Sequence, residues 1–297
     1  MSAHNRLHLL VAPFHNGLRD VSMGSGPIRL ATDHESRAGI EAEGWTVTSE
    51  EIEAVDETEP EIVRVIQLIR RLATRVAEAH SEGAFPLVLA GNCNSALGTT
   101  AGIGAENLGV VWFDAHADFD DPEENESGFF DVMGLAMLTG RGWRALRHTI
   151  PGHIPIPERN VILAGVRDLE GYQRDRLNRS ELAAIPGPID PELLKNALDA
   201  LRGRVARVYL HVDLDVLDIG VAQANKYSAP NGPSLGRLLE CMRLTTERLT
   251  VAGAAITAYD PAFDPDDRAI AAARAIAREL ARGVACGTAS QPTSATG

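Results

Sequence analysis

Six short runs of apolar, β-favouring residues constrain the fold of this chain more than any other feature of its sequence. Each run is almost continuously apolar, which is typical of strands buried on both faces of a parallel sheet. Longer segments separate the runs, as the crossover connections of a parallel sheet require. The predicted strands are Leu7–Pro13, Pro86–Ala90, Leu108–Phe113, Val161–Gly165, Arg207–Val212 and Val251–Thr257.

The segments between these strands favour helices. Glu61–His80 is the clearest case, because its apolar residues recur at spacings of three and four. Further helices are predicted at Gly134–Leu138, Pro191–Leu201, Ser234–Thr246 and Asp267–Arg282. Strand–helix alternation predicts an α/β fold with one domain, residues 1–286, built on a doubly wound, mostly parallel sheet with helices on both faces. The polar segment 287–297 is predicted to be a disordered tail.

The composition argues against several classes of function. The 297 residues carry a formal net charge of -13, whereas a nucleic-acid-binding protein would present a basic face. No apolar stretch approaches the ~20 residues needed to span a bilayer, so no membrane association is expected. Cys93, Cys241 and Cys286 cannot all pair and form no CxxC motif, which favours a reducing compartment. We therefore expect a cytoplasmic protein that acts on a small molecule.

Two of the predicted strands end in ionisable residues at every second position. Segment 111–122 reads VWFDAHADFDDP, and segment 209–218 reads YLHVDLDVLD. Alternate side chains share one side of an extended chain, so each segment presents a row of charged groups. Parallel neighbouring strands would bring both rows to the carboxyl edge of the sheet, where open α/β sheets bind ligands. The residues in the two rows are Asp114, His116, Asp118, Asp213 and Asp215.

These side chains predict a metal centre. Unpaired buried carboxylates would repel one another, and a divalent cation removes that cost. Oxygen ligands with one imidazole suit Mn²⁺ among the transition metals. An extended chain would separate Asp114 from Asp118 by about 13 Å. Two metals in a hydrolase lie only ~3.5–4 Å apart. The chain is therefore predicted to curl after His116.

Other interpretations of these residues explain less of the sequence. Polar strand ends at the surface would account for one such motif more readily than for two that each follow an apolar run. The spacing of an EF-hand calcium loop is absent, as are the GxSxG and GxxxxGK motifs. A thiol nucleophile at Cys93 paired with a histidine would leave the carboxylates unexplained. His211 is interpreted as a hydrogen-bonded strand histidine in preference to a residue facing the site.

At these motifs the chain resembles the ureohydrolase superfamily, which comprises the arginases, agmatinases and formimidoylglutamases. DAHAD at 114–118 resembles the family's DAHxD motif. DLDVLD at 213–218 resembles DxDxxDP, with Ile219 in place of the usual proline. The resemblance covers most of the chain, and the ordered set of motifs is more specific than any one of them. Weaker matches are Ala12–Pro13, Gly24–Arg29, Ala164–Asp168 and Ser127–Gly128.

The resemblance implies a parallel α/β fold, a homo-oligomer (trimer or hexamer) and a centre of two Mn²⁺ ions bridged by hydroxide. In the family pattern Asp114 and Asp213 match the carboxylates shared between the two ions. His116 and Asp215 match ligands of one ion. Asp118 matches a ligand of the other ion, and its carboxylate is implied to hydrogen-bond the bridging hydroxide.

Three positions depart from the family pattern. Cys93 stands where the GGDHS motif supplies a histidine ligand. A thiolate there would favour Zn²⁺ or Fe²⁺ over Mn²⁺, and a weak ligand would leave one ion bound instead of two; the competing interpretation is a small buried residue. Ala258 stands where arginases and agmatinases clasp the guanidinium with a glutamate, and Asp260 lies two residues further on. Asp131 replaces a histidine that acts as a proton shuttle.

We therefore predict a metal-dependent hydrolase of C–N bonds in a small linear amidine or guanidine compound, with metal-activated hydroxide as nucleophile. Asp118 is predicted to stabilise the tetrahedral intermediate and Asp131 to protonate the leaving nitrogen. An altered amidine, such as an N-hydroxyguanidine or a formimino group, would need different recognition. The alternative is a divergent family member that binds metal or ligand with little or no turnover, in a regulatory or structural role. The residues predicted to position the substrate are Asp120, Ser127 and Glu170.

Overall fold

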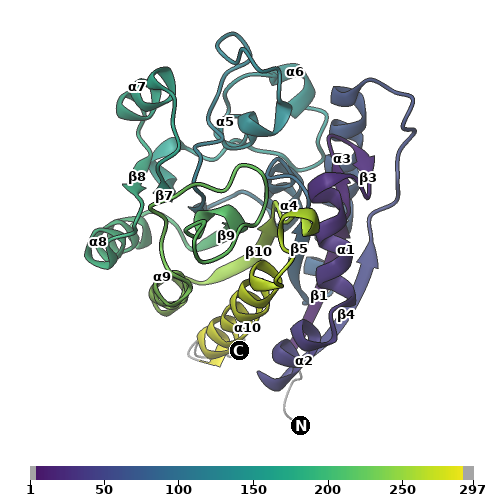
Figure 1. Ribbon diagram of the computed structural model, residues 1–297, viewed down its shortest axis with the longest axis vertical. Helices are drawn as coiled ribbons and strands as arrows, with labels where there is room; N and C mark the ends of the chain where they lie inside the picture. The colour runs from purple at the N-terminus through teal and green to yellow at the C-terminus, as the bar shows by residue number, and fades with distance from the viewer. Residues whose placement is uncertain (1–4, 290–297) are drawn as a thin grey trace, which may run out of the picture.

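A computed structural model of the protein describes residues 5–289. Its centre is an eight-stranded sheet in which all neighbouring strands run parallel, in the order β4-β1-β5-β10-β9-β6-β7-β8 (Figure 1). A short antiparallel pair, β2 (Phe14–His15) and β3 (Leu18–Arg19), follows the first strand. The strands of the sheet are β1 (Asn5–Ala12), β4 (Trp45–Glu51), β5 (Phe85–Ala90), β6 (Leu108–Phe113), β7 (Val161–Val166), β8 (Ala183–Pro186), β9 (Arg207–Asp213) and β10 (Val251–Thr257).

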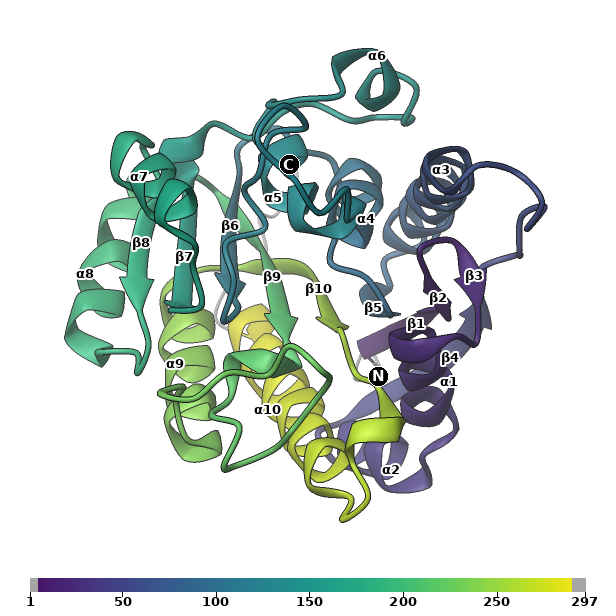
Figure 2. The same cartoon turned by 45° about the horizontal axis from the view of Figure 1, so that its top comes forward.

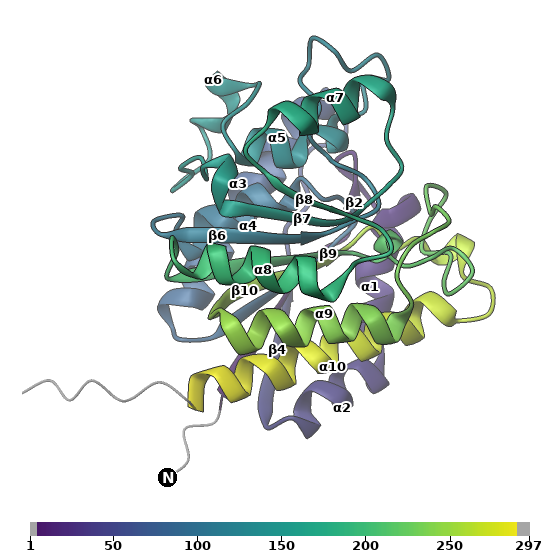
Figure 3. The same cartoon turned by 90° about the vertical axis from the view of Figure 1, so that its left-hand side faces the viewer.

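Helices cover both faces of this sheet. Figure 3 shows α2, α8, α9 and α10 on one face, and α3, α4, α5 and α7 on the other. The helices are α1 (Ser25–Thr32), α2 (His34–Ala42), α3 (Glu61–Ser81), α4 (Ser95–Ile103), α5 (Gly134–Leu138), α6 (Arg144–Arg147), α7 (Gly171–Arg179), α8 (Pro191–Arg202), α9 (Leu235–Arg248) and α10 (Arg268–Ala289). Single 3₁₀ turns lie at η1 (Ser22–Gly24), η2 (Phe130–Met133), η3 (Glu158–Asn160), η4 (Leu214–Val216) and η5 (Pro261–Phe263).

The sheet divides the apolar core into two layers. In β6, Val111 and Phe113 belong to the cluster that includes residues of α8, α9 and α10. The alternate residues Val110 and Trp112 belong to the cluster that includes residues of α3, α4 and α5. Both faces of a central strand are thus buried, and this explains why the strands are apolar without a break. The predicted doubly wound α/β fold is confirmed.

All six predicted strands are present, each to within two residues, whereas several smaller elements were not predicted. The edge strand β4 alternates exposed and buried residues in part, and β8 has four residues, so neither presents a continuous apolar run. Helix α10 ends at Ala289, three residues into the segment for which we predict a disordered tail. Residues 290–297 lie outside the described part of the chain.

Helix α4 was missed because it is buried almost all round and therefore carries no amphipathic signal. Its glycines allow close contact with α3. A Cβ at Gly98 would lie 2.7 Å from the Ile69 carbonyl oxygen, and one at Gly102 would lie 2.5 Å from the Val76 Cβ. The close approach of the two helices fixes the loop between β5 and α4, which contributes to the site described below.

The parallel arrangement brings the carboxyl ends of the central strands to one edge. Figure 2 shows the arrowheads of β6, β7, β9 and β10 pointing to the same side of the molecule. The segments that follow β5, β10, β9 and β6 are therefore neighbours there, although they are far apart in the sequence. Within residues 5–289, no helix is both long and apolar enough to cross a membrane.

Asp33 connects the start of α2 to α10. Its carboxylate accepts hydrogen bonds from the backbone N–H and the hydroxyl of Ser36, both at 2.7 Å. The two nitrogens of the Arg274 guanidinium lie 2.7 and 2.9 Å from its oxygens. Arg274, followed by Ser36, holds the pKa of Asp33 well below its ordinary value of 3.8. The interaction therefore stabilises the folded state when the carboxylate is charged.

Replacing Asp33 with alanine should lower the free energy of unfolding by about 1–2 kcal/mol at pH 7, through loss of the helix cap and the ion pair. Because the folded-state pKa is depressed, the contribution is complete above the unfolded pKa and is lost as pH falls through the folded one. The difference from the wild type should shrink below about pH 4 in urea titrations. Glu35→Ala is the control, because that exposed carboxylate also pairs with Arg274. Equal losses in both variants would contradict the prediction.

Candidate metal centre

The ionisable residues singled out from the sequence meet at the carboxyl edge of the four central strands. Asp114 directly follows β6, Asp213 is the last residue of β9, and Asp215 lies in the turn η4. Cys93 lies in the loop after β5, and Ala258 directly follows β10. These five residues come from four strands that are adjacent in the sheet.

The chain curls after β6 as predicted. The strand ends at Phe113, and Asp118 has a left-handed backbone with φ of 47°. The carbonyl oxygen of Asp118 accepts hydrogen bonds from the backbone N–H groups of Leu135 and Ala136, at 2.8 and 3.1 Å. These bonds to the start of α5 hold the turn in place. The Asp118 side chain is brought back to the site instead of continuing along the line of the strand.

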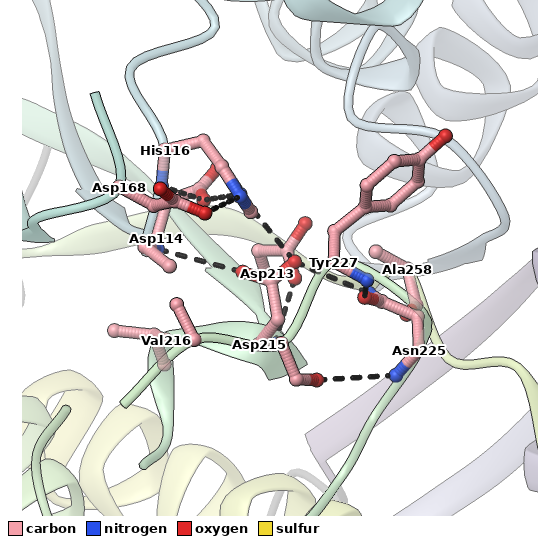
Figure 4. A network of polar contacts seen from close by, with 12 residues as sticks. Asp114, His116, Asp168, Asp213, Asp215, Val216, Asn225, Tyr227 and Ala258 are labelled. Carbon is pink, nitrogen blue, oxygen red and sulfur yellow. Dashed lines mark hydrogen bonds and ion pairs between the residues drawn. The ribbon is translucent and has the colours of Figure 1, made fainter. Parts of the chain in front are cut away.

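The first cluster comprises Asp114, His116 and Asp215 (Figure 4). The His116 Nδ1 lies 3.4 Å from Asp114 Oδ1 and 3.5 Å from Asp215 Oδ2. One donor atom from each of the three residues lies within 4.8 Å of the other two. The backbone N–H of His116 also donates to Asp114 at 2.7 Å, which fixes the start of the loop. This spacing is compatible with three ligands of one cation.

Neighbouring side chains orient this cluster. Asp168, after β7, has a carboxylate oxygen 3.6 Å from the outer nitrogen of His116. Asn225 donates to Asp215 at 3.2 Å and to the carbonyl oxygen of Ala258 at 2.7 Å. The Arg167 guanidinium donates to backbone carbonyls of the segment that follows β9, including those of Asp215 and Val216 at 3.1 and 3.0 Å. Contacts of this kind set the direction of metal ligands.

The second cluster contains Cys93, Asp213 and Asp131, all three of which are buried. The Cys93 thiol donates to Asp213 Oδ2 at 3.0 Å, and the backbone N–H of Asp215 donates to Asp213 Oδ1 at 2.8 Å. The Asp131 carboxylate accepts from the backbone N–H groups of Cys93 and Asn94, at 3.1 and 2.8 Å. The side chain of Asn92 donates to it at 2.6 Å. Asp131 therefore anchors the loop that carries Cys93.

A cavity of about 70 Å³ opens above both clusters. One wall is aromatic, because Phe129 and Tyr227 stack with their ring centres 5.9 Å apart. Tyr227 also meets the His116 ring edge-on at 6.4 Å. The lining residues are Met23, Cys93, His116, Asp118, Phe129, Asp131, Val132, Asp213, Asp215, Asn225, Tyr227 and Ala258.

Comparison with known proteins places this arrangement in a family. The model of the arginase family matches residues 6–282. The chain belongs to the arginase family. The predicted resemblance to the ureohydrolase superfamily is thereby confirmed.

Individual members of the arginase family differ in how much of the chain they match. An arginase of Staphylococcus aureus (strain MRSA252) is 34% identical over 162 residues, which cover 52% of this chain and 53% of that one. The chain thus spans about half the length of the first curated relatives it matches. An arginase of Bacillus subtilis is 33% identical over 216 residues, or 67% of this chain and 71% of that one. The arginase structure from Bacillus caldovelox has the same fold, with a TM-score of 0.83 at 24% identity over 93% of this chain and 98% of that one.

The carboxylates of this arginase-family site are held in an unfavourable environment. Burial, followed by the neighbouring Asp114 carboxylate, raises the pKa of Asp118 well above its ordinary value. Burial and the Asp215 carboxylate do the same to the pKa of Asp213. Burial also raises the pKa of Asp114. Each group would be more stable in its charged form with a cation beside it.

His116 and Asp215 form an ion pair, in which each stabilises the charged form of the other although burial disfavours both charged forms. Burial favours the neutral imidazole, but the Asp215 and Asp114 carboxylates outweigh it and raise the pKa of His116 well above 6.5. His116 in turn lowers the pKa of Asp215 against the effect of burial. One imidazolium cannot balance all the carboxylates that surround it. A bound cation would displace the proton of His116 and bring the additional positive charge.

The residues present fit divalent cations at two neighbouring positions. Asp114, His116 and Asp215 form an outer position of oxygen donors and one imidazole, the chemistry that suits Mn²⁺. Cys93 and Asp213 lie at an inner position, where the thiol adds a softer donor. Among residues 5–289 none donates a hydrogen bond to the Asp118 carboxylate, which leaves its oxygens free for a ligand.

Three residues predicted to position the substrate do not line the cavity. The buried Asp120 carboxylate accepts hydrogen bonds from Tyr172, Gln173 and Asn125. The exposed Ser127 hydroxyl donates to Asn125 at 2.8 Å. Glu170 caps the N-terminus of α7. The structure therefore gives each of them contacts that hold loops together, and a substrate role for them stays a prediction.

Several residues of the site were not found from the sequence. Asn225 and Tyr227 lie in an irregular loop after β9 that carries no recognisable motif. Trp112, which donates to Asp114 at 2.9 Å, is one apolar residue of an apolar strand in the sequence. Asp168 is the exception, because the motif that ends β7 did contain it. Its place beside His116 depends on the adjacency of β6 and β7.

Bound cations should stabilise the fold, because they neutralise buried carboxylates. At a concentration of 100 times the dissociation constant, Mn²⁺ should raise the melting temperature by about 5–10 °C. Asp114→Asn should melt at or above the wild-type temperature without metal, since it removes one repelling charge, and should gain little from Mn²⁺. Differential scanning calorimetry with and without chelator measures both effects.

The matched control is the double variant Glu123→Gln, Glu126→Gln, which removes two exposed charges from the segment between β6 and η2. It should keep the full gain from Mn²⁺. If Asp114→Asn and the control respond alike to metal, the buried carboxylates are not the binding site.

Proposed function

We propose that this protein is a metal-dependent hydrolase that cleaves a C–N bond in a small linear amidine or guanidine compound. The observation that supports it is the convergence of Asp114, His116 and Asp215 with Cys93 and Asp213 beside one cavity, which all of them except Asp114 line. Divalent cations held there would supply a hydroxide nucleophile at neutral pH by lowering the pKa of water. The protein's own residues would bind the substrate, orient it and move its protons.

Asp118 and Asp131 suit the two proton-handling roles because both carboxylates line the cavity. Asp118 receives no hydrogen bond from residues 5–289, so it is free to accept one from a nitrogen of the tetrahedral intermediate. Burial raises the pKa of Asp131 to about 6, although hydrogen bonds from Asn94, Asn92 and Cys93 oppose it. A carboxyl group that titrates near neutrality can deliver a proton to the leaving nitrogen.

The cavity wall offers aromatic surface to the amidine group of a substrate, and it lacks the carboxylate that would bind such a group by charge. Ala258 lines the wall at the position where the family pattern has glutamate. The Asp260 carboxylate does not replace it, since it caps η5 by accepting from Ala262 at 3.0 Å. The Lys226 ammonium already lies 4.8 Å from the centre of the Tyr227 ring, so this aromatic wall suits a planar group of low charge better than a second cation. We therefore place a less strongly charged amidine ahead of arginine as the substrate.

A second candidate is a divergent member that binds metal or ligand with little or no turnover. It is supported by the three hydrogen bonds that Asp131 already accepts, which tie the proposed acid to the Cys93 loop. The proposals inherited from the family, a homo-oligomer (trimer or hexamer) and two Mn²⁺ per chain, belong to both candidates. Sedimentation and elemental analysis would test them.

A panel assay tests the function. The Mn²⁺-loaded protein should release urea or ammonia from at least one linear guanidine, N-hydroxyguanidine or formimino compound, and should turn over arginine and agmatine slowly. Ala258→Glu should raise hydrolysis of arginine or agmatine at least about tenfold, because it restores a bidentate carboxylate partner. The steady-state rate of urea release is the measurement.

Ala258→Gln is the matched control, since it has the same length without the charge and should give no such gain. Release of no product from any panel compound, by a protein that elemental analysis shows to be metal-loaded, would favour the second candidate. An equal effect of the Glu and Gln variants would mean that residue 258 does not face the substrate.

A further inference from the structure

A buried histidine lies beside the inner position and has no part in the proposed mechanism. His211 is on β9, two residues before Asp213, and its side chain is fully buried. One donor atom each from Cys93, Asp114 and His211 lies within 4.8 Å of the other two. The three residues therefore bring sulfur, oxygen and nitrogen donors together from a loop and two adjacent strands.

The donor atoms of His211 and Cys93 both contact the same hydroxyl group, that of Thr257. The Thr257 hydroxyl oxygen lies 3.2 Å from the His211 Nε2 and 3.2 Å from the Cys93 Sγ. The other ring nitrogen, Nδ1, lies 2.8 Å from the Tyr209 hydroxyl. A partner at one nitrogen is what orients an imidazole whose other nitrogen binds metal.

The ring is also held from its face. Trp112 stacks on His211 with ring centres 3.6 Å apart and planes 14° from parallel. The Trp112 indole nitrogen donates to the Asp114 carboxylate at 2.9 Å. Trp112 thus fixes the position of the His211 imidazole relative to the Asp114 carboxylate. A purely structural hydrogen-bond network would explain the bonds to Tyr209 and Thr257, but not the meeting of three different metal-donor types.

We propose that Cys93, Asp114 and His211 supply the donors of the inner cation position, which lies beside Asp213, and make it selective for a thiophilic divalent ion such as Zn²⁺. Thiolate and imidazole are the ligands that Zn²⁺ prefers, whereas the outer position of Asp114, His116 and Asp215 suits Mn²⁺. Three protein donors are the number found in catalytic zinc sites. The proposal rests on the metal dependence of the proposed function and assigns different metals to its two positions.

Binding at this position exchanges one proton for the cation. The S–H bond of Cys93 breaks, a sulfur–metal bond forms, and the proton leaves to solvent, with no change of oxidation state. The hydrogen bond from Cys93 to Asp213 is lost in this exchange. The Thr257 hydroxyl can still donate to the sulfur, and His211 Nδ1 keeps the Tyr209 hydroxyl as its partner. One proton should therefore be released for each thiophilic ion bound.

Titration of the whole protein with Co²⁺, a spectroscopic substitute for Zn²⁺, tests the site without any substrate. A thiolate-to-cobalt charge-transfer absorption in the near ultraviolet should appear with one equivalent. It should be displaced by Zn²⁺ and not by Mn²⁺. Cys93→Ser should abolish the band. Cys241→Ser, which removes a buried thiol of α9, should leave it unchanged.

His211→Phe is the decisive variant, because phenylalanine keeps the stacking on Trp112 and lacks the donor nitrogen. Zn²⁺ affinity should fall at least about 100-fold in it, while Mn²⁺ affinity stays within about threefold. Tyr209→Phe removes only the orienting hydroxyl and should weaken Zn²⁺ binding about tenfold with the band retained. His116→Ala, at the outer position, should keep the band and lose Mn²⁺ binding.

A wild-type protein that binds Co²⁺ without the charge-transfer band would overturn the proposal, as would unchanged Zn²⁺ affinity in a folded His211→Phe variant. If His211→Phe does not fold, the Zn²⁺ affinity of Tyr209→Phe is the test instead. An unchanged Zn²⁺ affinity in Tyr209→Phe would also overturn the proposal. These outcomes leave the hydrolase proposal standing if the outer position binds Mn²⁺. Failure of the hydrolase assay with an intact cobalt band would leave this site standing instead.

Discussion

Mutual repulsion among buried carboxylates is the constraint on which the rest of this structure depends. Asp114, Asp118 and Asp213 lie at the carboxyl ends of adjacent strands, where burial raises the pKa of each. A sheet with such an edge is tolerable if cations are bound there or protons are taken up. The protonated His116 balances part of this charge. The same feature that costs stability without metal is the feature that makes the edge a candidate metal centre.

Much of the surrounding architecture serves to hold that edge. The Arg167 guanidinium donates hydrogen bonds to backbone carbonyls of the segment after β9. The Asp131 carboxylate accepts hydrogen bonds from backbone N–H groups of the loop after β5. Helix α4 packs closely on α3 through glycines, which fixes that same loop. Because ligand geometry tolerates only small displacements, such supports matter as much as the ligands themselves.

Two of the three departures from the family pattern share a direction. Cys93 brings sulfur to the inner position, and Ala258 removes a carboxylate from the cavity wall that Phe129 and Tyr227 line. Each change makes the site softer or less acidic while leaving the outer cluster of Asp114, His116 and Asp215 in place. Such a pattern is what redirection of a metal hydrolase to another substrate and another metal would produce. The inner donor set with His211 is consistent with that direction.

Local patterns in the sequence were sufficient for the parallel α/β fold, the six central strands and the two segments that carry Asp114 and Asp213. These features depend on burial and on alternation along one strand, so they are visible in a short stretch of chain. The place of Asn225 and Tyr227, the contact of His116 with Asp168 and the approach of His211 to Cys93 required the folded chain. They depend on which strands become neighbours and how loops cross the edge, and contacts between distant segments leave no periodic trace in the sequence.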